Sequence, residues 1–404
     1  MVKQGNREAP RSCEDLLRAM VGIDTVNGRI SGRTAAEREL AVYLESLAGA
    51  FGFPTRRLPI RDDSFNLILT HEIDAAAPWL LFESHMDTVT VEGMTIDPFG
   101  GEIRGGRMWG RGACDTKGSG AAMLWALKQY AGQSDQPNNI AIAYTTDEES
   151  LKEGAKALAS DQLPRFTWRP VGVVVGEPTL LRPVVAHNGA VRWKIRAQGV
   201  SCHSCDPSLG KSAISMMVKV IDALESRYIP ALTASHPLIG KAQCSINLIE
   251  GGTQINVIPE SCAITIDRRL APGEDMHKVL PEVETLLDEL RRSDPDLNVS
   301  QDDPFLDPAL DPEPNKPFLG FVQGVLAEMG LPTDPSGVSY GTDASQFSAE
   351  GMPAVIIGPG SIDQAHTKDE WLELDQLERS IDVYRNLMSR SVEGGGECRM
   401  MNDE

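Results

Sequence analysis

Apolar residues in the first half of the chain form short continuous runs that polar turns separate. Four of these runs predict strands: "FNLILT" (65–70), "WLLF" (79–82), "NIAIAYT" (139–145) and "VGVVVG" (171–176). Helical spacing predicts two helices within residues 14–53 and a third over 118–130. Strands that are apolar throughout are buried on both faces, so we expect an α/β fold in which helices cover both faces of a mostly parallel sheet.

The pattern changes after about residue 190. "AVRWKIRAQG" (190–199) alternates apolar and polar residues, as in a half-solvated strand. Four further elements follow it: a helix (211–226), strands near 243–250 and 261–269, and a helix around 275–292, before the strand-like "LNVS". This β-α-β-β-α-β order is typical of a ferredoxin-like α+β module. A segment rich in Pro and Asp, 301–317, predicts a linker.

A chain of 404 residues exceeds one hydrophobic core, so two domains are expected. Alternation of helices and strands resumes after residue 317, which predicts that the smaller module is inserted into the larger one. The expected boundaries are 1–188 for the first part of the larger domain, 189–302 for the insertion and 303–392 for the second part. Residues 393–404, "EGGGECRMMNDE", are expected to form a disordered tail.

The net charge is −20, from 38 basic and 58 acidic residues, and it argues against nucleic acid or an anionic membrane as a partner. The N-terminal segment is too polar for the apolar core of a signal peptide. Seven scattered cysteines argue against a disulfide framework and fit a cytoplasmic protein. Cys202 and Cys205, in "SCHSC", leave an alternative of a different class, a redox or structural zinc module.

Side chains that can bind metals gather where the predicted strands end. "ESHMDTV" places His85 and Asp87 on one face of a strand end. The motifs "GRGACDTKGSG", "TTDEES", "VVVGEPT" and "GPGSIDQAHTKDEW" add Asp115, Glu148, Glu149, Glu177 and His366. Each motif alone is compatible with an ordinary polar turn. Ligands of α/β sheets bind outside the carboxyl ends of the strands, so together these residues predict a metal site.

Histidine and carboxylate ligands suit zinc, and ligand type does not separate zinc from cobalt or manganese. Two divalent cations with three carboxylates and one hydroxide sum to zero charge (4 − 3 − 1), so such a site can be buried. Two metals about 3.5–4 Å apart would acidify a bridging water and polarise a carbonyl. One of the two adjacent glutamates, Glu148 or Glu149, would accept the proton of that water and pass it to a leaving amine.

The motifs "SHMDTV", "GRGACDTKG", "DEES", "GEPT" and "QAHTKDEW", in this order, resemble the co-catalytic zinc metallopeptidases and deacylases. That family includes aminoacylase, glutamate carboxypeptidase, succinyl-diaminopimelate desuccinylase and acetylornithine deacetylase, and "AHNG", "HSCDP" and "GPGSIDQAH" are most similar to the last. The resemblance spans residues 14 to 392. It implies that His85 and Glu177 hold one metal ion, that Glu149 and His366 hold the other, and that Asp115 bridges both. It also implies that Asp87 orients His85 and that Glu148 is the general base.

The resemblance makes the larger domain catalytic and the insertion a lid and dimerisation domain. His203 matches a histidine that stabilises the oxyanion, in its own active site or in that of a partner subunit. Asn256 and Arg269 match substrate-binding positions, with Arg268 a rival for the substrate carboxylate. His187, in "AHNG", is expected either to line the site or to lie in a linker.

These observations predict a metal-dependent amidohydrolase that removes the acyl group from an N-acyl-L-amino acid, with N-acetyl-L-ornithine as the leading substrate. The expected assembly is a homodimer through the inserted domain. Alternatives are a desuccinylase or carboxypeptidase acting on succinyl-diaminopimelate or an acyl-glutamate, and a catalytically silent homologue. Glu177, where relatives that are aminopeptidases have Asp, favours a deacylase or carboxypeptidase. Ser150 and Leu151 follow the paired glutamates where relatives commonly have Gly, so that loop is expected to differ.

Overall fold

The computed structural model describes residues 9–392, and the predicted disordered tail, 393–404, lies outside them. The chain divides into two compact units. The first unit comprises the residues up to Val185 together with Pro312–Ser336 and the residues from Thr342 onward. The second comprises Ala186–Asp311 and Gly337–Gly341. Each unit has a hydrophobic core of its own.

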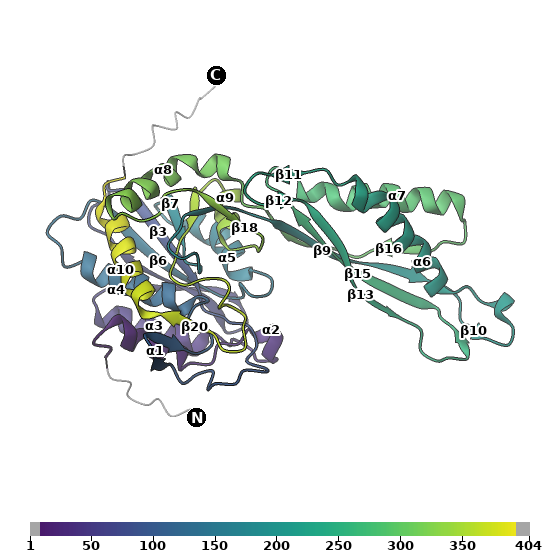
Figure 1. Cartoon of the computed structure of the whole chain (residues 1–404), viewed down its shortest axis with the longest axis horizontal. Coiled ribbons are helices and arrows are strands. Elements are labelled where there is room, and N and C mark those ends of the chain that lie inside the picture. Colours follow the sequence, from purple (N-terminus) through teal and green to yellow (C-terminus); the bar gives the residue numbers. More distant parts are fainter. Residues whose placement is uncertain (1–8, 393–404) are drawn as a thin grey trace, which may run out of the picture. The chain divides into compact units, whose positions relative to one another are not determined.

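The first unit is built on an eight-stranded sheet with the order β1-β2-β6-β3-β7-β19-β8-β18 (Figure 1). Its strands are β1 (Thr55–Arg61), β2 (Ser64–His71), β3 (Trp79–His85), β6 (Asn139–Thr145), β7 (Pro170–Val175), β8 (Val184–His187), β18 (Ser336–Val338) and β19 (Ala354–Ile356). The central strands β6, β3, β7 and β19 are parallel, whereas β1, β2 and β8 pair antiparallel with their neighbours. All four strands predicted from the apolar runs are present.

Helices cover this sheet because its central strands are apolar on both faces, and every residue of β3 and β6 is buried. The helices are α1 (Cys13–Val21), α2 (Gly28–Ser31), α3 (Arg38–Ala50), α4 (Lys117–Tyr130), α5 (Glu153–Ala157), α8 (Pro312–Glu328), α9 (Ala344–Ala349) and α10 (Leu374–Ser389), with helical turns η1 (Leu158–Gln162) and η2 (Leu163–Arg165). Helices α1, α4, α8 and α10 pack together, while α9 packs on β7 and β19 and contacts α5. Residues 14–53 thus contain three helices where the sequence predicted two.

A small three-stranded sheet, with the order β20-β5-β4, joins the end of the chain to its first third. It contains β4 (Glu102–Arg104), β5 (Arg107–Trp109) and β20 (Trp371–Glu373). In the antiparallel pairing of β20 with β5, Trp371 lies opposite Trp109. This sheet therefore brings the segment after His366 beside the segment before Asp115.

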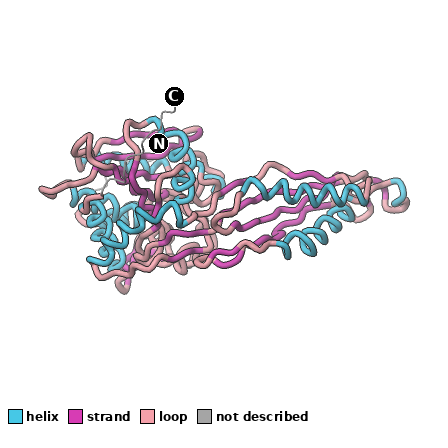
Figure 2. Tube along the Cα trace, turned by 90° about the horizontal axis from the view of Figure 1, so that it is seen from above, coloured by secondary structure: helices cyan, strands magenta, loops and turns pink. Residues whose placement is uncertain are grey.

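The second unit has the architecture of a ferredoxin-like module. Its strands β9 (Gly189–Gln198), β13 (Gln243–Gly251), β15 (Ser261–Leu270) and β16 (Val299–Gln301) lie in the order β13-β15-β9-β16, all antiparallel (Figure 1). Figure 2 shows helices running alongside these strands. The helices α6 (Ala213–Ala223) and α7 (Val279–Ser293) share one core with them. Shorter elements are β10 (Cys202–His203), β11 (Ser235–His236), β12 (Gly240–Lys241), β14 (Val257–Ile258), η3 (Pro207–Leu209), η4 (Leu224–Tyr228), η5 (Ile229–Ala231) and η6 (Met276–Lys278). The predicted α/β fold with an inserted α+β unit is confirmed.

The prediction of a linker over 301–317 is wrong. Phe305–Asp307 form strand β17, which pairs antiparallel with β9, and Pro312 begins α8. Proline is tolerated in the first turn of a helix, where its missing N–H group has no intrahelical partner to lose. The excess of Pro and Asp suggested a linker. Local composition carries no information on pairing with a strand more than 100 residues away, so it could not predict β17.

Within residues 9–392, no helix is both long enough and apolar enough to cross a lipid bilayer.

Candidate metal centre

The predicted metal-binding side chains lie where neighbouring strands of the first unit end. His85 is the last residue of β3, Glu148 and Glu149 follow β6, and Glu177 follows β7. These strands are parallel neighbours, so their carboxyl ends meet at one edge of the sheet. Two loop residues complete the group: Asp115 shortly before α4, and His366 after β19.

Asp115 lies between the two histidines. Its Oδ1 atom is 3.1 Å from His85 Nε2, and its Oδ2 atom is 3.1 Å from His366 Nε2. Glu177 Oε1 lies 3.8 Å from His85 Nε2, and Glu149 Oε1 lies 3.1 Å from His366 Nε2. The five side chains thus form two groups, each with one histidine and one glutamate, that share Asp115. The resemblance implies the same grouping, and the role of each residue as a ligand remains a prediction.

The donor set fits divalent cations. Ligand atoms of His85, Asp115 and Glu149 all lie within 4.8 Å of one another. Nitrogen and carboxylate oxygen are donors that zinc, cobalt and manganese accept. The buried carboxylates of Asp115, Glu149 and Glu177 repel one another unless cations or protons neutralise them, so this cluster favours binding of positive charge.

The ionisation of these groups supports that conclusion. Burial, followed by the negative charge of Asp115, raises the pKa of Glu149 to about 8 and that of Glu177 well above its usual value. Hydrogen bonds to Asp115 and Glu149 raise the pKa of His366 to about 11. Burial opposes a charge on His85, but hydrogen bonds to Asp115 and other carboxylates raise its pKa well above its usual value. Without metal, the cluster therefore retains protons that cations would displace.

Asp87 is fully buried and holds the loop after β6 in place. Its Oδ1 atom accepts a hydrogen bond from the Glu148 N–H at 3.0 Å, and its Oδ2 atom accepts one from the Glu149 N–H at 3.0 Å. Asn27 Nδ2 donates to the same Oδ2 atom at 2.8 Å. The nearest acceptor to His85 Nδ1 is the main-chain carbonyl of Asp87 at 3.0 Å, with the carboxylate at 3.6 Å. Asp87 therefore positions both a histidine and the paired glutamates.

The structure distinguishes the two adjacent glutamates, which the residues alone do not. Glu149 faces His366, whereas Glu148 Oε1 lies 3.4 Å from the ammonium group of Lys152. Burial raises the pKa of Glu148, and the charge of Lys152 opposes that rise. An ionisable carboxylate beside a cation, next to the candidate ligands, suits a general base. Sequence reasoning missed Lys152, which follows the paired glutamates by only three residues.

The predicted substrate-binding residues lie in the second unit, and their roles remain predictions. His203, on β10, and Asn256, directly before β14, are both exposed, and these two strands pair with each other. Arg269, on β15, is partly exposed and pairs with Asp267 at 2.9 Å. Arg268 also pairs with a carboxylate, that of Glu274, but its side chain is buried, whereas that of Arg269 is partly exposed.

Two other sequence features have ordinary structural surroundings. His187 is buried, and its Nδ1 atom lies 2.9 Å from the main-chain carbonyl of Asn188. Cys202 and Cys205 are free thiols. Within residues 9–392, the close group of potential metal ligands described above contains neither cysteine, so the structure does not favour a zinc module built on them.

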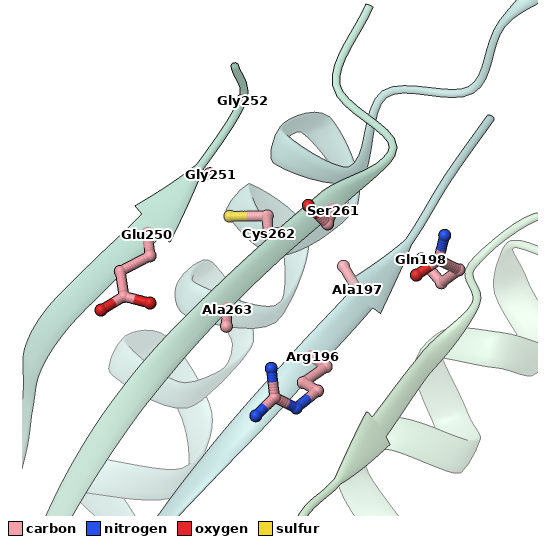
Figure 3. Close-up of a pocket in the computed structure, with 9 residues that line it drawn as sticks. All are labelled: Arg196, Ala197, Gln198, Glu250, Gly251, Gly252, Ser261, Cys262 and Ala263. Atoms are coloured by element: carbon pink, nitrogen blue, oxygen red, sulfur yellow. The ribbon is translucent and has the colours of Figure 1, made fainter. Parts of the chain in front are cut away.

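A pocket of about 290 Å³ lies on the sheet of the second unit. Figure 3 shows Arg196, on β9, and Glu250, on β13, on either side of Ala263, on β15. Arg196 already pairs with Asp302 at 2.7 Å. None of the predicted site residues lines this pocket, and we assign no function to it.

The fold and this centre are those of a metal-dependent hydrolase. Residues 81–390 match Peptidase family M20/M25/M40, and the chain belongs to that family, which confirms the resemblance. It is 31% identical over 392 residues to an acetylornithine deacetylase from Klebsiella pneumoniae (strain 342), an alignment that covers 94% of this chain and 96% of the relative. The protein is accordingly a hydrolase of amide bonds.

Solved structures of the family share the fold. An M20 family metallo-carboxypeptidase from Sulfolobus solfataricus superposes with a TM-score of 0.75 at 16% identity, covering 92% of this chain and 97% of the other. A dinuclear metal-binding peptidase of the M20 family from Bacillus subtilis superposes with a TM-score of 0.70 at 14% identity, covering 93% and 96%.

Proposed function

We propose that the protein removes the acyl group from an N-acyl-L-amino acid, with N-acetyl-L-ornithine as the leading substrate. The observation that carries the proposal is Asp115, whose two carboxylate oxygens each face a different histidine. Similarity to an acetylornithine deacetylase along nearly the whole chain supports the choice of substrate. Release of ornithine would place the enzyme in arginine biosynthesis.

The residues of the centre divide into ligands and a base. His85 and Glu177 would hold one divalent cation, Glu149 and His366 the other, and Asp115 both; zinc suits this set, and so do cobalt and manganese. When bound, the cations would polarise the substrate carbonyl and activate water. Glu148 accepts the proton of the attacking water and donates it to the leaving amine. Lys152, 3.4 Å away, favours the charged form of Glu148 that this step requires.

Residues of the second unit would recognise the substrate. The guanidinium of Arg269 presents a planar fork that suits the substrate α-carboxylate, and its partial exposure supports that role over the buried Arg268. His203 would stabilise the oxyanion, in its own subunit or in its partner, and Asn256 would contact the substrate.

We further propose a homodimer that forms through the second unit, in the cytoplasm. Strand β13 is the terminal strand of the described sheet, and it exposes Leu248 and Ile249 by 58% and 59%. An unpaired strand edge with exposed apolar side chains favours pairing with another chain. A second copy of this protein would cover both.

A substrate panel tests the proposal. Protein loaded with zinc or cobalt is incubated with N-acetyl-L-ornithine, N-succinyl-diaminopimelate and N-acyl-glutamates, and release of the free amine is measured. We expect the highest kcat/KM with N-acetyl-L-ornithine, and loss of turnover in Asp115→Asn. Faster hydrolysis of another member of the panel would change the substrate but keep the reaction. No hydrolysis of any member by metal-loaded protein would overturn the proposed function.

A further inference from the structure

Glu370 is a buried carboxylate that belongs to neither group of candidate ligands. It lies four residues after His366 and directly before β20. Its Oε1 atom accepts hydrogen bonds from the N–H groups of Cys114 at 2.8 Å and Asp115 at 3.0 Å. Its Oε2 atom accepts one from the Gly112 N–H at 3.0 Å. One side chain thus holds three N–H groups of the segment 112–115, which ends at the residue that both histidines share.

Arg111 completes this arrangement. Its side chain is almost fully buried, and its Nη1 atom donates to Glu370 Oε2 at 2.8 Å. Its Nε atom donates to the carbonyl of Thr90 at 3.1 Å, and its Nη2 atom donates to the carbonyl of Thr367 at 3.0 Å. The guanidinium therefore joins three segments: the one after His85, its own, and the one after His366.

The backbone supports the same connection. The pairing of β20 with β5 continues by one hydrogen bond, from the Gly110 N–H to the carbonyl of Glu370 at 3.0 Å. A buried ion pair costs desolvation energy that good geometry and further hydrogen bonds must offset. Here both carboxylate oxygens are satisfied, and three guanidinium nitrogens each have an acceptor. Such a fully bonded pair fixes the segments that it joins more firmly than apolar packing would.

We propose that Glu370 and Arg111 form a positioning pair that sets the separation of His85, Asp115 and His366 before cations bind. The inference rests on the proposed metal centre. Asp115 must present one oxygen to each histidine, and its own N–H is held on Glu370, so a rotation of this turn would take one oxygen out of place. Glu370 and Arg111 position ligands and are not catalytic residues.

The test measures cation binding and not only activity. Metal-free protein is titrated with Co²⁺, and the visible absorption spectrum reports the coordination geometry and the Kd. Glu370→Gln keeps the size of the side chain, but its NH₂ group replaces an oxygen that accepts hydrogen bonds, so the hydrogen bonds to that oxygen are lost. We expect a 10- to 100-fold higher Kd for Co²⁺ and an altered spectrum, the range typical when a group behind a metal ligand is removed. Arg111→Lys retains the charge but loses the fork, and we expect a smaller change in the same direction.

The second unit offers a matched control. Glu274 also pairs with a buried arginine, Arg268, and accepts a backbone N–H, that of Ala271 at 2.7 Å. Glu274→Gln should lower Tm while leaving the Kd and spectrum of bound Co²⁺ unchanged. Spectra and Kd values within twofold of the unmodified protein in Glu370→Gln or, if that variant does not fold, in Arg111→Lys would overturn the inference. Failure of the unmodified protein to bind Co²⁺ would overturn the proposed centre as well, so the two failures are distinguishable.

Discussion

The substitution Asp87→Asn tests how the centre is held together. The carboxylate of Asp87 accepts three hydrogen bonds, from the backbone N–H groups of Glu148 and Glu149 and from Asn27 Nδ2. Asparagine has the same size but replaces one oxygen by an NH₂ group. In either orientation that group meets at least one N–H donor, so at least one hydrogen bond to a charged acceptor is lost.

The magnitude follows from the surroundings. Asn27 cannot turn over to compensate, because its Nδ2 atom also donates to Asp147 at 3.0 Å and its oxygen accepts from the Arg29 N–H at 2.9 Å. Loss of one hydrogen bond to a buried charged group costs about 1.5–3 kcal/mol. Removal of a negative charge near the acidic side chain of Glu37 offsets part of this cost in the metal-free protein. We therefore expect a small fall in Tm and a 10- to 100-fold fall in kcat/KM.

The assay combines kcat/KM for N-acetyl-L-ornithine with metal content and Tm for each variant. Asp222→Asn, an exposed change on α6, is the control for loss of one negative charge. A variant Asp87→Asn with unchanged kcat/KM and full metal content would refute the argument that this carboxylate positions the paired glutamates.

Three further predictions concern charge. Burial raises the pKa of Glu37 to about 7 from an ordinary 4.5, so the stability that its proton provides is present below pH 4.5 and lost as the pH rises through 7. In Glu37→Gln this pH-dependent loss should disappear, so the difference in the free energy of unfolding between pH 4.5 and pH 8 should shrink by up to about 3 kcal/mol. Urea unfolding at the two pH values measures it, and a pH dependence equal to that of the unmodified protein would contradict the prediction. Removal of metal by a chelator should lower Tm more at pH 8 than at pH 6, because protons take the place of the cations only below the pKa of Glu149, which is about 8. Calorimetry measures this, and a fall in Tm of equal size at both pH values would contradict it. Arg268→Met should cost about 1.5–3 kcal/mol of stability, because Glu274 loses its charged partner and keeps only the hydrogen bond from the Ala271 N–H. Arg269→Met should instead raise KM at least tenfold with little change in Tm, and a fall in Tm without a rise in KM for this variant would contradict its role in substrate binding.

The strands and the candidate ligands could be predicted from the sequence for one physical reason. The first four residues of β3, Trp79 to Phe82, are all apolar because both faces of the strand are buried, so the polar end of the strand with its histidine stands out. Several such ends carry histidine or carboxylate, and parallel pairing brings them together. The second unit was predictable because residues 190–199 alternate apolar and polar side chains, and in β9 the apolar ones from Val191 onward are buried while the polar ones between them are more exposed.

The supporting side chains could not be predicted. Glu370 and Arg111 act through contacts across more than 250 residues, and no periodic pattern marks either of them. Lys152 lies near the paired glutamates, but the turn that brings its ammonium group back to Glu148, closed by a hydrogen bond from the Lys152 N–H to the carbonyl of Asp147 at 2.7 Å, has no clear signal in the sequence. Strand β17 forms because β9 offers it a free edge, which the local excess of Pro and Asp obscured.

The segments that begin and end the second unit lie next to each other. The N–H of Leu310 donates to the carbonyl of His187 at 3.1 Å, so the first and last segments of the insertion are hydrogen-bonded to each other. A few glycines could span that distance, and insertions of this kind are commonly tolerated for the same reason. All five candidate ligands would remain in the shortened protein, which offers a way to study cation capture by a minimal scaffold, apart from selection among acyl amino acids.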